Sequence, residues 1–137
     1  GHQIGHHMPA DQLTARLPLS EFRRQFQLAS QALQQAADPQ PLPLHWFRPG
    51  GGWFHAPMLA HVRAAGLRLA LGSIFPWDTL HPPAVFQRWF VLKNAHPGGI
   101  LILHDRADTI TTTLANLRVL IPQLRQRGYR FVSLDEL

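Results

Sequence analysis

The chain has 137 residues, of which 45% are hydrophobic and 15% charged, a composition that is typical of a globular domain and excludes general disorder. There is no cysteine, which excludes disulfide bonds and thiolate metal sites. The net charge of +5 comes mainly from arginines scattered without a dense basic cluster, which argues against nucleic-acid binding, and no apolar run reaches the roughly 20 residues of a membrane span.

The first segment, GHQIGHHMPAD, holds three histidines and one aspartate. His7 and Asp11 are four residues apart, a spacing that brings two side chains to one face of a helical turn and suits Zn²⁺. A catalytic zinc usually takes three protein ligands. His2 and His6 are possible third ligands, but we expect both to be bystanders, because His2 lies at the fraying end and His6 points away from His7 on most backbones. The alternative is the remnant of a purification tag.

A helix is predicted over residues 17–37, with Ser20 as a possible N-cap. Helical spacing of apolar residues supports it, at Phe22, Phe26, Ala29 and Leu33. Several prolines follow and end it.

From residue 44 onward the sequence alternates between strand and helix patterns. Strands are expected over residues 44–49, 67–75, 98–105 and 129–134, and helices around 56–66, 81–95 and 109–128. Such alternation implies βαβ units, hence an α/β fold with a parallel sheet and helices outside it. The run ILIL at 100–103 is apolar at every position and predicts a strand covered on both faces.

The strand ends carry groups that bind metal or move protons, as expected where functional side chains collect in such folds. His104 follows the apolar strand and is suited to acid–base work near neutrality, although it could simply cap the strand. Asp78 ends the preceding strand, so its carboxylate could orient His104 and hold its proton; the alternative is a helix N-cap or turn residue.

The stretch RPGGGWFH places three glycines between Arg48 and Trp53. Glycines let the backbone approach a ligand closely, Trp53 would form a wall, and Arg48 would be a fixed positive charge suited to a carboxylate. The alternative is a flexible loop with a packed tryptophan. Neither the dinucleotide fingerprint nor the P-loop pattern is present.

Taken in order, GHQIGHHMPAD, FRPGGGW, SIFPWD and GGILILHD resemble the second to fifth motifs of the polysaccharide deacetylase family, the carbohydrate esterases of the NodB homology domain. The closing LRQRGYRFVSLDEL is also typical of that family. Three departures stand out. Asp11 replaces the usual second metal histidine, Thr79 replaces the tryptophan after the fourth-motif aspartate, and the first motif, Thr-Phe-Asp-Asp-Gly-Pro, is missing.

The resemblance implies a hydrolase that removes N-acetyl groups from polysaccharides or oligosaccharides with a bound divalent metal, zinc being the first expectation. By analogy His7 and Asp11 bind the metal. Arg48 holds the catalytic base, and Asp78 tunes His104, the acid that protonates the departing amine.

The family resemblance also implies the substrate-binding residues and the architecture. Ile102 shares a strand face with His104 and would line an acetyl-methyl pocket with Trp53, while Trp77 belongs to the substrate wall. The fold implied is a distorted (β/α)7 barrel, of which residues 1–137 form a single incomplete domain, because seven βα units need about 200 residues.

From the missing Asp-Asp motif, little or no deacetylase activity is expected of this chain alone. Two alternatives stay open. One is a catalytically dead carbohydrate-binding module on the same fold, and the other is a basic structural or interaction domain without metal. The acetylated substrate, the compartment and the oligomeric state are not specified by any visible pattern.

Overall fold

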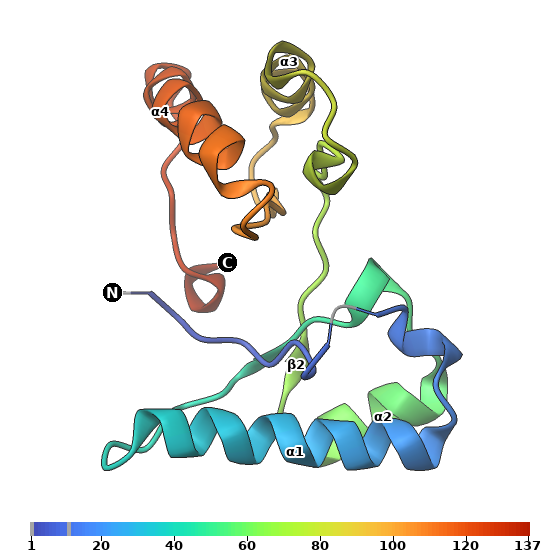
Figure 1. Cartoon of the computed structure of the whole chain (residues 1–137). Coiled ribbons are helices and arrows are strands. Elements are labelled where there is room, and N and C mark those ends of the chain that lie inside the picture. Colours follow the sequence, from blue (N-terminus) through green and yellow to red (C-terminus); the bar gives the residue numbers. More distant parts are fainter. Residues whose placement is uncertain (1, 11) are drawn as a thin grey trace. The chain divides into compact units, whose positions relative to one another are not determined.

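The structure, a computed structural model, describes residues 2–10 and 12–137. The chain divides into two compact units, Gly1–Leu71 (unit 1) and Gly72–Leu137 (unit 2), and each has its own apolar core. Helices alternate with short extended segments in both units (Figure 1). This order confirms the predicted α/β alternation.

Unit 1 contains parallel extended segments centred on β1 (Trp46–Phe47). β1 pairs in parallel with β2 (Arg68–Leu69), and an isolated parallel bridge joins it to His6. The His6 N–H donates to the Trp46 carbonyl at 2.8 Å, and the Arg48 N–H donates to the His6 carbonyl at 2.9 Å. Because parallel segments end at the same edge, this pairing brings Arg48 beside the residue that follows His6.

Two helices cover these segments, α1 (Leu19–Ala37) and α2 (Ala56–Ala64), and they contact each other (Figure 1). Their buried residues share one core with β1 and with the residue before β2, made of Phe22, Phe26, Phe47, Met58, Val62 and Leu67. Burial of Phe22, Phe26 and Ala29 follows the helical spacing that the sequence predicts.

The predicted N-cap of α1 is wrong. The helix begins at Leu19, its N-cap is Pro18, and no side chain caps it. Pro18 has an extended ψ of 144°, and its carbonyl accepts the N–H of Phe22 at 2.9 Å. Ser20 therefore already lies inside the first turn, where its hydroxyl no longer takes the capping position.

Unit 2 is built around a parallel bridge between Ile74 and Leu101, in which the Ile102 N–H donates to the Ile74 carbonyl at 2.9 Å. The helices α3 (Ala84–Asn94) and α4 (Ile110–Gln126) pack against each other (Figure 1). The core of unit 2 consists of Ile74, Val91, Leu120 and Leu124. The sequence predicts both helices correctly.

The strands are much shorter than predicted. Within the described residues, segment 98–105 makes only the bridge at Leu101, and segment 129–134 forms no strand and leads into a 3₁₀ turn, Leu134–Glu136. Residues 100–103 are half-buried, so the expected cover on both faces is also absent in this structure. Side-chain pattern reports β propensity, but a strand also needs at least one neighbouring segment with which its backbone forms hydrogen bonds.

None of the helices in the described part of the chain has the length and apolar character needed to cross a membrane.

Candidate functional site

The His104–Asp78 pair lies in unit 2. The bridge between Ile74 and Leu101 aligns two parallel segments, and Asp78 and His104 follow them at the same edge. Trp77 has φ +53°, a left-handed conformation that turns the chain into the 3₁₀ helix Asp78–Leu80. This turn directs the Asp78 side chain toward His104.

Asp78 binds His104 through both its ring and its backbone. The Nδ1 of His104 lies 3.0 Å from Asp78 Oδ1 and 3.2 Å from Oδ2, and its backbone N–H donates to Oδ2 at 2.6 Å. A carboxylate accepts, so Nδ1 carries the hydrogen. Asp78 is only 3% exposed, so its charge interacts with the ring in a medium that screens poorly.

This geometry can support proton transfer. With Nδ1–H held by a buried carboxylate, Nε2 is the nitrogen that exchanges a proton with another group, as in the histidine–aspartate half of a triad. Phe75 contacts the ring edge-on at a centroid distance of 5.9 Å. The structure thus brings together the two residues that the sequence places at neighbouring segment ends, while their catalytic roles stay predictions.

The His7–Arg48 pair lies in unit 1. The Nδ1 of His7 donates to the Arg48 carbonyl at 2.6 Å, and the Arg48 guanidinium Nη2 donates to His7 Nε2 at 3.0 Å. A carbonyl oxygen only accepts, so Nδ1 carries the hydrogen and Nε2 has the lone pair. The backbone carbonyl therefore fixes the tautomer of His7.

This tautomer fits a metal ligand. Metal-bound histidines usually donate their second ring N–H to a carbonyl or carboxylate, the arrangement that His7 has with the Arg48 carbonyl. Metal coordination at Nε2 requires the Arg48 guanidinium to move aside. Asp11, the second predicted ligand, lies outside the described residues. Among the described residues, no three His, Cys, Asp or Glu side chains gather into a group that could hold a metal.

His6 is a core residue. It is fully buried, stacks on Phe26 at 4.2 Å, donates from Nε2 to the Phe26 carbonyl at 3.0 Å and accepts the Met8 N–H at Nδ1. Burial lowers the pKa of His6 below its ordinary value. Both nitrogens are occupied, so His6 is a bystander as expected, while His2 is exposed.

The glycine loop after Arg48 is held by Thr14, a residue that the sequence did not single out. The Gly50 N–H donates to the Thr14 hydroxyl at 2.6 Å, and Thr14 is fully buried. A Cβ at Gly50 would overlap the Gln12 carbonyl and the Thr14 hydroxyl. Gly50 is therefore required for close approach between two backbone segments.

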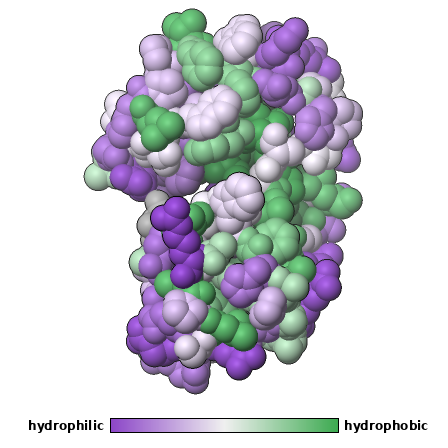
Figure 2. Space-filling view, turned by 90° about the vertical axis from the view of Figure 1, so that its right-hand side faces the viewer, coloured by the Kyte–Doolittle hydropathy of each residue, from purple (hydrophilic) through white to green (hydrophobic). Residues whose placement is uncertain are grey.

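The predicted substrate-binding residues differ in exposure. Trp53 is 70% exposed and Trp77 is 42% exposed, whereas Ile102 is half-buried and lies where a Cβ on Gly72 would stand. Other apolar side chains are also open to solvent on the face that Figure 2 presents. Trp53 belongs to unit 1 and Ile102 to unit 2, so their shared acetyl-methyl pocket stays a prediction.

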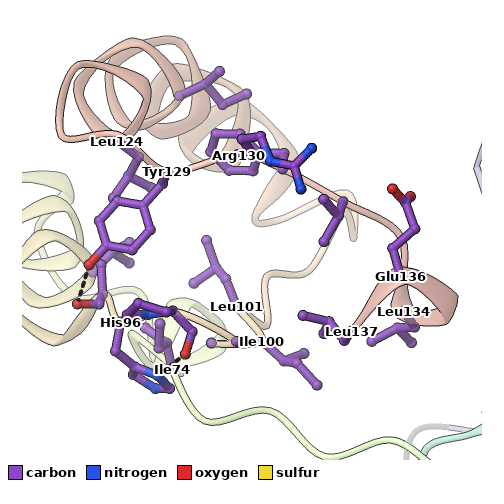
Figure 3. Close-up of a pocket in the computed structure, with 18 of the residues that line it drawn as sticks. Ile74, His96, Ile100, Leu101, Leu124, Tyr129, Arg130, Leu134, Glu136 and Leu137 are labelled. Atoms are coloured by element: carbon purple, nitrogen blue, oxygen red, sulfur yellow. Dashed lines mark hydrogen bonds between the residues drawn. The ribbon is translucent and has the colours of Figure 1, made fainter.

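A cavity of about 620 Å³ lies in unit 2 between segment 97–103, α4 and the last residues of the chain (Figure 3). Its walls are mostly apolar and include Ile74, Ile100, Leu101 and Leu124. Neither Asp78 nor His104 lines it. A smaller cavity of about 250 Å³ is lined by Asp78 together with Gln87, Thr109 and Thr113.

Curated proteins include clear relatives of the whole chain. A chitooligosaccharide deacetylase from Bradyrhizobium is 32% identical over 148 residues, an alignment that covers 100% of this chain and 67% of the relative. The chain belongs to the polysaccharide deacetylase family. A peptidoglycan N-acetylglucosamine deacetylase from Bacillus cereus is 36% identical over 93 residues, which cover 66% of this chain but only 44% of that deacetylase. No family model matches the chain.

Solved structures of this deacetylase family share the fold. A peptidoglycan N-acetylglucosamine deacetylase in complex with 4-naphthalen-1-yl-N-oxidanyl-benzamide aligns with a TM-score of 0.88 and 26% identity, over 99% of this chain and 63% of that one. A family 4 acetyl xylan esterase from Clostridium thermocellum, in complex with a cobalt ion, aligns with a TM-score of 0.82 and 26% identity over the same shares.

A CE4 family pseudoenzyme from Bacillus anthracis also has this deacetylase fold, with a TM-score of 0.84 and 22% identity over 97% of this chain and 45% of its own. The family thus includes proteins described as enzymes and a protein described as a pseudoenzyme. Membership alone therefore does not decide which of the two this chain is.

Proposed function

We propose that this chain is part of a metal-dependent deacetylase that hydrolyses N-acetyl groups of a polysaccharide or oligosaccharide. The observation that carries the proposal is the contact between the buried Asp78 carboxylate and His104 Nδ1, at 3.0 Å. His104 lies at the carboxyl end of the segment that resembles the family's fifth motif. The relatives named as peptidoglycan and chitooligosaccharide deacetylases support this substrate class.

His104 is the proposed acid. Its protonated ring gives the Nε2 proton to the departing amine nitrogen as the C–N bond breaks, and it is left neutral with the hydrogen on Nδ1. Asp78 stays ionised, compensates the imidazolium charge and keeps the ring in one orientation. The proton therefore leaves from the side of the ring that Asp78 does not contact.

His7 and Asp11 are the proposed metal ligands, and zinc is the proposed ion because it accepts imidazole nitrogen and carboxylate oxygen. A bound divalent ion supplies Lewis-acid polarisation of the acetamide carbonyl and a more acidic water. His7 contributes the Nε2 lone pair, and the Arg48 carbonyl keeps that lone pair available by accepting the Nδ1 hydrogen.

Arg48 is proposed to hold the catalytic base. Here its guanidinium donates to His7 Nε2, so this role requires it to turn from the imidazole to a carboxylate. A guanidinium binds a carboxylate more strongly than it binds a neutral imidazole, because the guanidinium and the carboxylate carry opposite charges. No Asp-Asp pair occurs in this sequence, so the base is proposed to come from another segment.

Trp53, Trp77 and Ile102 are the proposed substrate-binding residues. Both tryptophans are open to solvent, and an aromatic face can pack against the apolar face of a sugar ring. Residues 1–137 are proposed to form one incomplete deacetylase domain, within a distorted (β/α)7 barrel. The isolated chain is accordingly expected to have little or no turnover.

A chimera tests the proposal. The amino-terminal segment of the Bradyrhizobium relative, placed ahead of residue 1, should supply the first motif and give zinc-dependent release of acetate from N-acetylated chitooligosaccharides. Asp78→Asn should lower kcat by roughly 10²–10⁴-fold, since it removes the charge that holds His104. Asp108→Asn is the matched control, because Asp108 is exposed and pairs with His81 and Arg106 instead.

The alternative is a catalytically dead carbohydrate-binding module. The Arg48 guanidinium on His7 Nε2 favours it, because that atom is the proposed metal donor, and a pseudoenzyme has the same fold. Binding without acetate release, unchanged by His104→Ala, would support the module. Acetate release that depends on His104 would reject it.

A further inference from the structure

The backbone carbonyl of His104 accepts two side-chain hydrogen bonds. The Thr109 hydroxyl donates to it at 3.0 Å and the Thr113 hydroxyl donates at 2.8 Å. Thr109 is 2% exposed and Thr113 is 5% exposed, so water does not compete freely for either bond. Both threonines come from the start of α4, so this helix is fastened to the residue that carries the imidazole.

These two hydroxyls do not make the hydrogen bonds that threonine side chains at a helix start usually make. Thr109 is the N-cap of α4, where a hydroxyl normally accepts an N–H of the first turn, but it makes no capping bond and donates to His104 and, at 3.3 Å, to the Arg106 carbonyl. A threonine inside a helix often donates to the carbonyl four residues back, yet Thr113 donates to His104.

The other side of the His104 backbone is fixed as well. Its N–H donates to Asp78 Oδ2 at 2.6 Å, while its carbonyl is held by the two threonines. The peptide groups before and after the Cα are therefore both anchored. The ring extends from that Cα, and its Nδ1 contacts Asp78 at 3.0 Å.

The same buried face of α4 also holds the loop after Asp78. One turn beyond Thr113, the Asn116 side chain donates to Gln87 Oε1 at 2.9 Å, and Gln87 in turn donates to the Pro82 carbonyl at 2.9 Å. Asn116 and Gln87 are buried. The helix α4 thus contacts His104 directly, and it contacts the loop after Asp78 through Gln87.

We propose that Thr109 and Thr113 are positioning residues that hold the His104 backbone so that its Nδ1–H meets Asp78. Their relevance to catalysis rests on the proposed function, in which His104 is the acid. The positioning itself is a property of the folded chain and is measured without any turnover.

Nuclear magnetic resonance of the 137-residue chain gives the test, because ring ¹⁵N shifts distinguish the two neutral tautomers of His104. The native chain should have the hydrogen on Nδ1. Thr113→Val removes the hydroxyl at nearly constant volume and should shift a measurable fraction of His104 to the Nε2–H form. Thr111→Val is the control, because Thr111 is exposed on the same helix.

A second pair guards against a general packing effect. Thr113→Ser and Thr113→Ala both lose the methyl group and differ only by the hydroxyl, so the serine variant should keep the native tautomer and the alanine variant should lose it. The same tautomer in the native chain, in Thr113→Val and in Thr113→Ala would overturn the proposal, even if thermal stability falls.

Catalysis separates this proposal from the proposed function. In the chimera Thr113→Val should lower kcat by about tenfold with little change in KM, because a displaced acid affects the chemical step more than binding. A chimera without acetate release from any N-acetylated substrate would reject the proposed function. The tautomer measurement would still decide whether the threonines position His104.

Discussion

The imidazole of His6 stacks on the ring of Phe26 at 4.2 Å and donates a hydrogen bond to the carbonyl of the same residue at 3.0 Å. The His6 side chain therefore links the amino-terminal segment to α1, both by the face of its ring and by a ring N–H. The two adjacent histidines near the start of the chain point in different directions. His6 faces the core of unit 1, and His7 faces the guanidinium of Arg48, the residue after β1.

The buried position of His6 predicts loss of stability in acid. Burial lowers the pKa of His6 in the folded chain below the unfolded value of 6.5, and His61 is shifted in the same direction by burial. The unfolded state then binds more protons, so the free energy of unfolding is largest above pH 6.5 and falls as pH drops below it.

Urea unfolding of the chain at pH 7 and pH 5 measures this effect. The midpoint should decrease toward pH 5, and His6→Gln should show a smaller decrease, whatever its stability at pH 7. His2→Gln, at an exposed position, should keep the native decrease. An equal decrease in the native chain and in His6→Gln would contradict the assignment.

Gly50 predicts a steric cost. Gly50→Ala would place a Cβ against the Gln12 carbonyl and the Thr14 hydroxyl, so one backbone segment must move, at a cost of about 1–3 kcal/mol in the free energy of unfolding. Gly5→Ala is the control, because its nearest atom lies at an ordinary 3.5 Å. Thermal unfolding checks both, and equal Tm values would be inconsistent with the tight approach.

The tautomer of His7 predicts its part in metal binding. His7→Gln removes the Nε2 lone pair and should weaken Zn²⁺ binding to the chain by more than the 10–100-fold that loss of an outer-shell partner costs. Isothermal titration calorimetry measures it, with His96→Gln as an exposed control. Affinity unchanged in His7→Gln would remove His7 from the metal site.

Aromatic rings on α3 extend the substrate wall proposed at Trp77. The ring centroid of Phe86 lies 6.3 Å from that of Trp77 and 5.8 Å from that of Trp89, and Trp89 is 56% exposed. We predict that Trp89→Ala weakens binding of long N-acetylated oligosaccharides by about 3–10-fold, near the 0.5–1.5 kcal/mol of an aromatic contact, and leaves disaccharides unaffected.

Fluorescence titration of the chain with oligosaccharides of increasing length checks this prediction. Leu114→Ala is the matched control, since Leu114 is 48% exposed on α4 and has no aromatic ring. Equal weakening by both substitutions would mean that exposed apolar area, and not ring stacking, accounts for the effect.

The helices were predictable because they depend on local pattern, and the His104–Asp78 contact was predictable because parallel segments end at the same edge. Apolar spacing identifies α1 through Phe22 and Phe26, and the two parallel segments carry Asp78 and His104 to one edge. Strand length was not predictable, since residues 129–134 have strand-forming side chains but make no strand pairing in the described part of the chain.

The supporting threonines show the limit of sequence pattern more sharply. The hydroxyls of Thr14, Thr109 and Thr113 form hydrogen bonds with backbone atoms of residues that are 36, 5 and 9 positions away. Every residue has such backbone atoms, so the sequence does not identify these partners. Thr109 was visible as a helix-start residue, but its N-cap position predicts a bond to α4 and not to His104. Only the folded arrangement reveals which acceptor the hydroxyl chooses.

Trp77 and His81 both have φ +53°, one on each side of the turn that carries Asp78. Left-handed backbone at residues other than glycine costs about 1–2 kcal/mol each, so surrounding contacts must maintain this turn. Relaxation of either residue would swing the carboxylate away while α3 and α4 persist. A preparation can therefore give a full helical circular dichroism spectrum and still contain molecules without the pair, so the active fraction has to be titrated separately from the folded fraction.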